Sequence, residues 1–141
     1  MSWNIRVRIP AEDYWGDLEG EALKGAVRVV EKAGDLAKAR VQQLLVRAEG
    51  PAAPDEPPHS HTEEGLAKSV EREPAVTLSS RKGVKGVSTR VVVTDPGAAR
   101  DEFGAIDARG IRTFPHPFLR PAFEDVAADI EALFREWARS V

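Results

Sequence analysis

The hydrophobic pattern at the start of the chain has a period of two residues. Within "WNIRVRI", residues 3–9, apolar side chains alternate with Asn4, Arg6 and Arg8. Such alternation indicates a half-buried β-strand, because successive side chains of a strand point to opposite faces of the sheet. We expect the strand to end at Pro10, which cannot continue a ladder of sheet hydrogen bonds.

The pattern then changes to steps of three and four residues and predicts an amphipathic helix over residues 17–48. Asp13 or Asp17 would cap its start, and the Gly-Pro pair at 50–51 would end it. Such a helix would be about 48 Å long, whereas a compact domain of this length is about 37 Å across. We therefore expect the helix either to break near Gly34 or to project and meet another molecule.

The middle of the chain is dominated by a segment rich in proline, acidic and small residues. This segment, "GPAAPDEPPHSHTEE" at 50–64, predicts a flexible loop within a single domain. It is a candidate to become ordered only on contact with a neighbouring protein. The following "GLAKSV", residues 65–70, fits either a short helical turn or the start of a strand.

Two further strands are predicted after this region. They are "AVTLSS" at 75–80 and "GVSTRVVVT" at 86–94, and "RKGVKG" between them suits a hairpin connection. The short segment "AARDEFG" at 98–104 fits no single element type, and residues 105–116 are expected to form a loop.

The last segment has the clearest helical pattern. Acidic residues crowd its first turns and arginines its last, as the helix dipole favours. Because proline is tolerated only near a helix start, we expect the regular helix to begin at about Pro121, after a rigid lead-in. This lead-in would direct Phe118 and Leu119 toward an apolar surface and leave Arg120 free to pair. The apolar face comprises Phe118, Leu119, Phe123, Val126, Ile130, Leu133, Phe134, Trp137 and Val141.

Together these elements predict one α+β domain over residues 1–141, with a small, mostly antiparallel β-sheet packed against a long N-terminal helix and a C-terminal amphipathic helix. The composition, 42% hydrophobic and 30% charged, is that of a globular protein. A net charge of −3 and a pI of about 5.7 give no overall basic field of the kind that marks nucleic-acid binders. The chain has no cysteine, which excludes disulfides and thiol chemistry. It also has no apolar run long enough to span a membrane.

Two motifs give the chain a resemblance to a known family. The first is the Pro-Phe-Leu-Arg-Pro-Ala core of "HPFLRPAFEDVAADIEALF", residues 117–122, which opens the last helix. The second is the Glu-Phe-Gly that ends "ARDEFG", residues 102–104. Both resemble the small head–tail joining proteins of long-tailed bacteriophages and prophages, the neck or tail-completion proteins often described as minor tail components. The order of elements agrees with that family over nearly the whole chain.

A third, divergent element supports the same resemblance. The family carries a Thr-Gly-x-Leu-x-x-Ser-Ile segment after its first helix, and "EEGLAKSV" keeps Leu66, Ser69 and Val70 of it. Glu63 and Glu64 stand where the family has threonine and glycine.

The resemblance implies a structural protein of the virion, made in the host cytoplasm, with no enzymatic activity and no cofactor. It implies a homo-oligomeric ring, commonly six-fold, that joins or seals the head-connector complex to the tail tube and leaves an axial passage for DNA. Its partners would be copies of itself, the adjacent connector or stopper protein, and the tail-tube or terminator protein. The alternative within the same class is the tail terminator, the ring that ends tail-tube growth.

The rigid lead-in supplies most of the candidate contacts between ring subunits, because a proline-stiffened segment loses little conformational entropy on docking. An arginine at its tip would pair with a carboxylate across the interface. The alternative is that Phe118 and Leu119 fill the core of their own subunit while Arg120 lies on its surface. The candidate interface residues are Pro117, Phe118, Leu119, Arg120, Pro121, Glu102 and Phe103.

A basic segment at 81–90 is the candidate contact to DNA or to a neighbouring ring. Its cations are Arg81, Lys82, Lys85 and Arg90, and the alternative is a solvated hairpin. Contact with the DNA backbone would be non-specific and sensitive to salt. A more distant alternative for the whole chain is a small DNA-binding or regulatory module that uses this segment.

The sequence shows no motif typical of catalysis or of a metal site. No nucleophile motif of the Gly-x-Ser-x-Gly type and no glycine-rich phosphate loop is present. His59 and His61 lie in a loop without the scaffold that a metal site needs. We therefore expect neither catalysis nor a metal.

Overall fold

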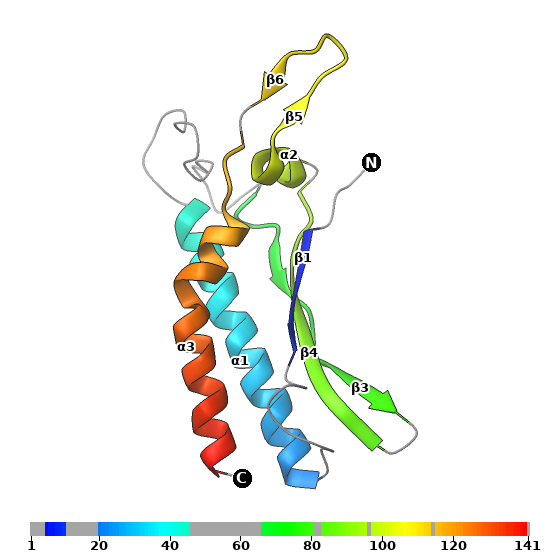
Figure 1. The fold of residues 1–141 in the computed structure, drawn as a ribbon, viewed down its shortest axis with the longest axis vertical. Helices are drawn as coiled ribbons and strands as arrows, with labels where there is room; N and C mark the ends of the chain where they lie inside the picture. Colours follow the sequence, from blue (N-terminus) through cyan, green and yellow to red (C-terminus); the bar gives the residue numbers. More distant parts are fainter. Residues whose placement is uncertain are drawn as a thin grey trace.

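The computed structural model describes residues 5–10, 20–45, 66–80, 83–95, 97–113 and 115–140; at 5–10, 78–80, 83–85, 101 and 113 it describes the backbone alone. Two long helices pack side by side against one face of an antiparallel sheet, and a small hairpin projects from one end (Figure 1). The predicted α+β architecture is confirmed. One core cluster lies between the helices and the sheet and draws residues from both.

The strand β4 (Gly83–Val93) is the centre of the sheet. It pairs with β1 (Ile5–Pro10) along one edge, and with β2 (Val70–Arg72) and β3 (Val76–Ser80) along the other, always antiparallel. The three predicted strands are therefore present. The prediction for 81–86 is wrong in part, because the ladder to β3 extends to the Ser80↔Gly83 pair and leaves only residues 81–82 as the connection.

The helix α1 (Gly20–Leu45) is continuous through Gly34, so of the two alternatives the break at that glycine is wrong. A Cβ atom at Gly34 would lie 2.8 Å from the Arg72 Cδ and Thr89 Cγ2 atoms. The glycine is thus needed for the helix to lie close to the sheet. Leu44 and Leu45 at the end of α1 are buried in the core, so the described helix presents no projecting apolar end. The predicted caps and the 50–64 loop lie outside the described residues.

The helix α3 (Leu119–Ser140) runs antiparallel to α1 along its whole length (Figure 1). Its predicted apolar face is confirmed over the described residues, with Leu119, Ala122, Val126 and Phe134 buried and their neighbours half-buried. Near the start of α3, Asp125 accepts hydrogen bonds from Arg40 Nε and Nη2 at 2.9 and 2.8 Å. At the other end, the absence of a side chain at Gly25 lets Trp137 pack against α1.

The segment between sheet and α3 is more regular than expected. Residues 98–104 contain a short helix, α2 (Ala98–Phe103), and the loop predicted at 105–116 contains a hairpin of β5 (Ala105–Ile106) and β6 (Arg112–Thr113). The loop prediction is wrong because the turn stabilises itself. The Asp107 carboxylate accepts hydrogen bonds from the Arg109 and Ile111 amides at 2.8 and 2.9 Å, and Gly110 supplies a φ of 79°.

The segment predicted to be either a helical turn or a strand contains both. Residues 66–69 form turns, in which Ser69 Oγ donates to the Leu66 carbonyl at 2.8 Å, and β2 begins at Val70.

Candidate functional site: a capped joint and a projecting arm

A buried carboxylate joins α2 to the start of α3. Glu102 is 8% exposed, and its Oε2 atom accepts hydrogen bonds from the Phe118 and Leu119 amides at 2.8 and 3.0 Å. Its Oε1 atom accepts a third from the Arg120 amide at 3.1 Å. The first amides of a helix have no partner within it, and a negative charge there also interacts favourably with the helix dipole. We call Glu102 and residues 118–120 the capped joint.

The position of Pro121 completes the hydrogen bonding of this helix start. The amides of residues 118, 119 and 120 donate to Glu102, and the Ala122 amide donates to the Phe118 carbonyl at 3.2 Å. Residue 121 lies between them, and as a proline it has no amide hydrogen to satisfy. α3 therefore begins at Leu119, two residues before the expected start, because the carboxylate caps its first turn. The two motifs that carry the family resemblance thus form one structural unit.

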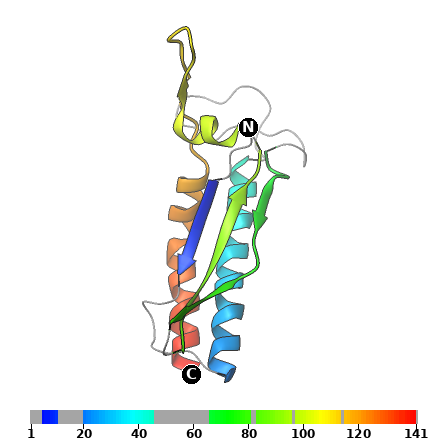
Figure 2. The same cartoon turned by 90° about the vertical axis from the view of Figure 1, so that its right-hand side faces the viewer.

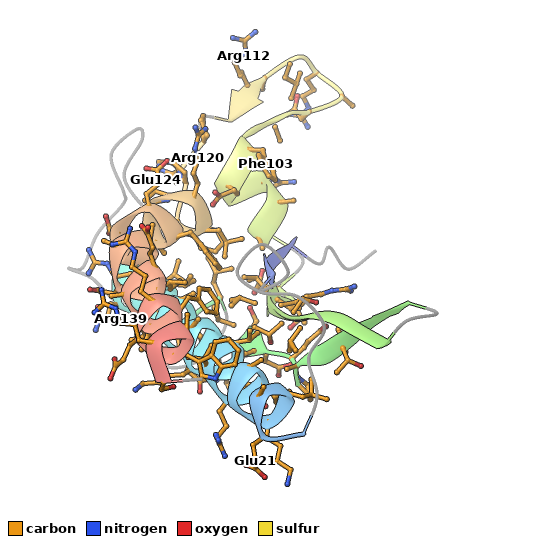
Figure 3. All side chains as sticks on the ribbon, turned by 60° about the horizontal axis from the view of Figure 1, so that its bottom comes forward. Glu21, Phe103, Arg112, Arg120, Glu124 and Arg139 are labelled. Atoms are coloured by element: carbon orange, nitrogen blue, oxygen red, sulfur yellow. The ribbon has the colours of Figure 1, made fainter. Side chains whose placement is uncertain are left out.

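The structure separates the candidate interface residues into buried and exposed groups. Phe118 and Leu119 are 0% and 2% exposed and fill the core of their own subunit, as one of the two sequence interpretations expected. Pro117 and Pro121 are half-buried. Arg120 is exposed and its Nε atom pairs with Glu124 Oε1 of the same helix at 3.2 Å (Figure 3). An exposed pair of this kind stabilises a helix by about 0.3–0.5 kcal/mol.

Phe103 lies beside Glu102 in sequence but has the opposite environment. Its side chain is 72% exposed, at the base of the projecting hairpin (Figure 3). Gly104 follows with φ 73° and ψ 176°, a conformation that essentially only glycine adopts, and its amide donates to the Arg100 carbonyl at 2.8 Å. In the Glu-Phe-Gly motif the glutamate is therefore turned inward, the phenylalanine outward, and the glycine allows the chain to turn into β5.

The hairpin itself, residues 105–113, stands away from the two helices and the sheet (Figures 1 and 2). We call it the arm. It exposes Ile106 and Ile111, which are 65% and 59% exposed. With Phe103 and Val76, these are the large hydrophobic side chains most open to solvent in the described part of the chain. Arg112 points outward from the arm (Figure 3). Sequence analysis missed the arm; the signal for it was the Asp-Ala-Arg-Gly turn at 107–110.

The basic segment is placed only in part. Arg81 and Lys82 lie outside the described residues, and Lys85 is described only as backbone within β4. Arg90 lies in β4, where it pairs in register with Arg8, and its carbonyl accepts from the Glu73 amide at 2.8 Å. Most of the predicted loop is therefore strand, and contact with DNA stays a prediction.

A second ionic cluster, which sequence analysis also missed, ties β2 to α1. Arg72 donates from Nη1 to Glu31 Oε2 at 2.6 Å and from Nε to Asp35. Burial alone would lower the pKa of Arg72, but the hydrogen bonds and charges of these two acids together raise it. The acids flank Gly34 along α1, so the cluster lies where helix and sheet approach most closely. We assign it a structural role.

Two further findings concern metal-holding clusters and grooves in the described part of the chain. Among them no group of three His, Asp or Glu side chains is arranged to hold a metal ion, while His59 and His61 lie outside the described ranges. A groove lies between the start of α1 and the end of α3, and its lining residues are Glu21, Ala22, Gly25, Arg28, Val29, Lys32, Trp137 and Ser140. None of the described helices is long and apolar enough to cross a membrane.

Comparison of the chain with protein-family models, with curated proteins and with solved structures finds no match.

Proposed function

We propose that the chain is a structural protein of the phage neck, which forms a ring that joins or seals the head-connector complex to the tail tube. The proposal starts from the resemblance carried by residues 102–104 and 117–122. The observation that supports it most is the capped joint, because it turns these two motifs into one rigid unit from which the arm projects. The proposed role is mechanical and involves no turnover.

The arm is the best candidate for the contact between ring subunits. Phe103, Ile106 and Ile111 are large apolar side chains that the fold leaves in water, and exposed apolar groups of this kind mark interaction sites. Subunits of a ring make head-to-tail contacts, in which a feature on one copy meets a different surface of the next. A projecting arm fits such a contact. This assigns the interface to Phe103 and the arm in place of Phe118 and Leu119.

Deletion of the gene from its phage genome tests the proposal. Loss of a neck protein should yield DNA-filled heads and separate tails of normal length, and the wild-type gene supplied in trans should restore joined particles. A tail terminator has the same ring architecture, and its loss should instead yield tails of uncontrolled length. Normal virions from the deletion would rule out both roles. Averaged images of the particles, with the protein tagged, would locate the ring.

A further inference from the structure

The groove between the start of α1 and the end of α3 combines an aromatic side chain with apolar and basic ones. Gly25 lies directly against Trp137, since a Cβ atom at Gly25 would overlap the indole Nε1 atom. Ala22 and Val29 of α1 continue the apolar part of the lining, and both are half-buried. The volume of the groove is about 460 Å³, within the range of ligand-binding clefts. Figure 3 brings this end of the molecule forward, with Glu21 labelled at the start of α1.

Two cations of the lining have no counter-charge in the described part of the chain. Arg28 and Lys32 are exposed, lie one turn apart on α1 and form no ion pair with a described residue. Glu21, the acid of the lining, pairs instead with Lys24 Nζ at 3.4 Å. Glu136 of α3 pairs with neither cation. The groove therefore favours an occupant that is apolar on one side and acidic on another.

One segment of the chain has this composition. Residues 50–64, which lie outside the described residues, contain four acidic residues, four prolines and neither lysine nor arginine. The segment thus carries four negative charges, whereas the net charge of the whole chain is −3, so the remainder of the chain is slightly basic. Charge complementarity therefore favours contact between this segment and a basic surface of the same protein.

The prolines of the segment are spaced to match an aromatic groove. Pro51, Pro54 and Pro57 form two overlapping Pro-x-x-Pro motifs, "PAAP" and "PDEP". Such motifs favour the polyproline II helix, which has three residues per turn, so the three prolines would share one edge and Asp55 and Glu56 would lie on the others. Aromatic grooves bind segments of this kind because the helix is ordered before it docks.

The lengths of the groove and of the proline motif also agree. The lining of α1 extends from Glu21 to Lys32, which is about 16 Å along the helix. Pro51 and Pro57 are six residues apart, or about 19 Å in a polyproline II helix. The motif can therefore follow the groove along its length.

The segment of the same chain is poorly placed to reach this groove. α1 ends at Leu45, about 20 Å along the helix from Lys32, and the six residues from Leu45 to Pro51 span at most about 22 Å. After the segment the chain is again at the far end of α1, because Gln42 Nε2 donates to the Ala67 carbonyl at 3.2 Å. Only a fully extended chain would place the segment in its own groove, at a cost in conformational entropy. A second copy has no such constraint.

We propose that the groove between α1 and α3 binds the acidic, proline-rich segment, residues 50–64, of a second copy of the chain. The prolines would pack on Trp137 and the apolar lining, and the acids between them would pair with Arg28 and Lys32. Because these ion pairs are exposed, the contact is weak and sensitive to salt. The groove lies at the opposite end of the molecule from the arm (Figure 1), so this contact requires neither the arm nor the neck role.

Reversal of the charges on each side of the contact tests the inference in the full chain. All chains carry I106S/I111S, so that association through the arm does not mask the result, and sedimentation velocity at low salt measures association. Adding either R28E/K32E or D55K/E56K should raise the Kd of self-association at least about tenfold, since each change brings like charges together. An equimolar mixture of these two variants should associate as tightly as the parent, because each groove then meets a segment of opposite charge.

A matched control reverses two exposed cations away from the groove. K68E/R109E should associate like the parent. A parent that stays monomeric at every concentration and salt, or a mixture that does not restore association, overturns the inference.

A synthetic peptide of residues 50–64 identifies the occupant of the groove. When it is added to the parent chain, the amides of residues 21–32 and 137–140 should shift, and they should not shift in R28E/K32E. The absence of shifts in the parent, as expected if residues 11–19 of the same chain fill the groove, would also overturn the inference.

These experiments are independent of the gene deletion. Chains that associate through the groove, but whose deletion leaves normal virions, would remove the neck proposal and leave the inference standing. A chain whose deletion separates heads from tails, but whose groove does not respond to the peptide, would give the reverse outcome.

Discussion

The capped joint and the arm are neighbours in sequence, yet each reverses the usual placement of its residue types. In the joint a carboxylate is buried, and in the arm large apolar side chains are exposed. Glu102 is 8% exposed and its two oxygens accept three backbone hydrogen bonds, whereas Phe103 is 72% exposed. The hydrogen bonding of the joint is satisfied within one subunit, because every polar group that the joint buries has a partner there.

The exposed apolar side chains of the arm have no such partners within the subunit that the structure describes. Removing Phe103, Ile106 and Ile111 from water would be favourable, and nothing in the described part of the chain does so. The difference assigns the joint to the stability of the domain, and it fits the proposal that the arm contacts another molecule. Substitutions in the two regions should therefore separate into those that unfold the protein and those that leave it folded.

The largest effect is expected for Phe118→Ala, because the ring is 0% exposed and its loss leaves a cavity in the core. The variant should lose about 4 kcal/mol of unfolding free energy, measured by urea denaturation. Phe103→Ala is the matched control and should change the same quantity by less than about 0.5 kcal/mol. Similar losses in both variants would mean that the two phenylalanines do not differ as described.

Glu102→Ala should follow, with a loss of about 3 kcal/mol of unfolding free energy, because three amides at the start of α3 lose their acceptor. Glu124→Ala removes an exposed glutamate from the first turns of the same helix and is the control. Amide hydrogen exchange should show faster exchange at residues 118–120 in the first variant only. Unchanged protection there would contradict the capping role of Glu102.

The parts of this comparison differ in how well the sequence predicts them. The two long helices and the strands follow from hydrophobic periodicity, since one buried face imposes a period of 3.6 or two on the residues that form it. α1 and α3 were predictable to within a few residues for this reason. The same pattern could not show that Gly34 permits contact with Thr89, because that contact joins residues far apart in the chain.

The site was less predictable, because its determinants are pairwise and distant. Glu102 caps amides sixteen to eighteen residues further on, and no local pattern announces such a bond. The family resemblance identified both halves of the joint but not their contact. The arm was missed although Asp107 and Gly110 are typical turn residues, because strands of two residues are too short to show alternation.

Gly104 separates the joint from the arm, and Gly104→Ala should cost about 2 kcal/mol of unfolding free energy, since its backbone conformation is strained for any residue with a Cβ atom. Gly110→Ala also replaces a glycine with positive φ, but within the turn of the arm. It should speed hydrogen exchange in residues 105–113 and leave the urea transition unchanged. A shift of that transition in Gly110→Ala would show that the arm contributes to global stability.

Arg120→Ala is expected to have a small effect on the isolated chain, about 0.4 kcal/mol, because it breaks only the exposed pair with Glu124. Arg135→Ala breaks an exposed i,i+4 pair with Glu131 nearer the C-terminal end of the helix, where an arginine is better placed, and should cost as much or slightly more. A much greater defect of Arg120→Ala in particle assembly, at equal stability, would restore Arg120 as an inter-subunit contact. If the two variants assemble equally well, Arg120 contributes only to the surface of its own subunit.

The smallest effect on stability, and the sharpest division between the two regions, is expected when the arm is made polar. The variant I106S/I111S should keep the wild-type unfolding free energy within about 0.5 kcal/mol, because both side chains are already largely in water. Its incorporation into particles, measured with a tag, should nevertheless fall below that of V76S, a single change of a half-exposed apolar residue on β3 to serine. Loss of stability in I106S/I111S would show that the arm contributes to the stability of the domain. Full incorporation of this variant would contradict the proposal that the apolar side chains of the arm form the contact between subunits. If I106S/I111S is as stable as wild type but is not incorporated into particles, the arm contributes to the contact between subunits and not to the stability of the fold.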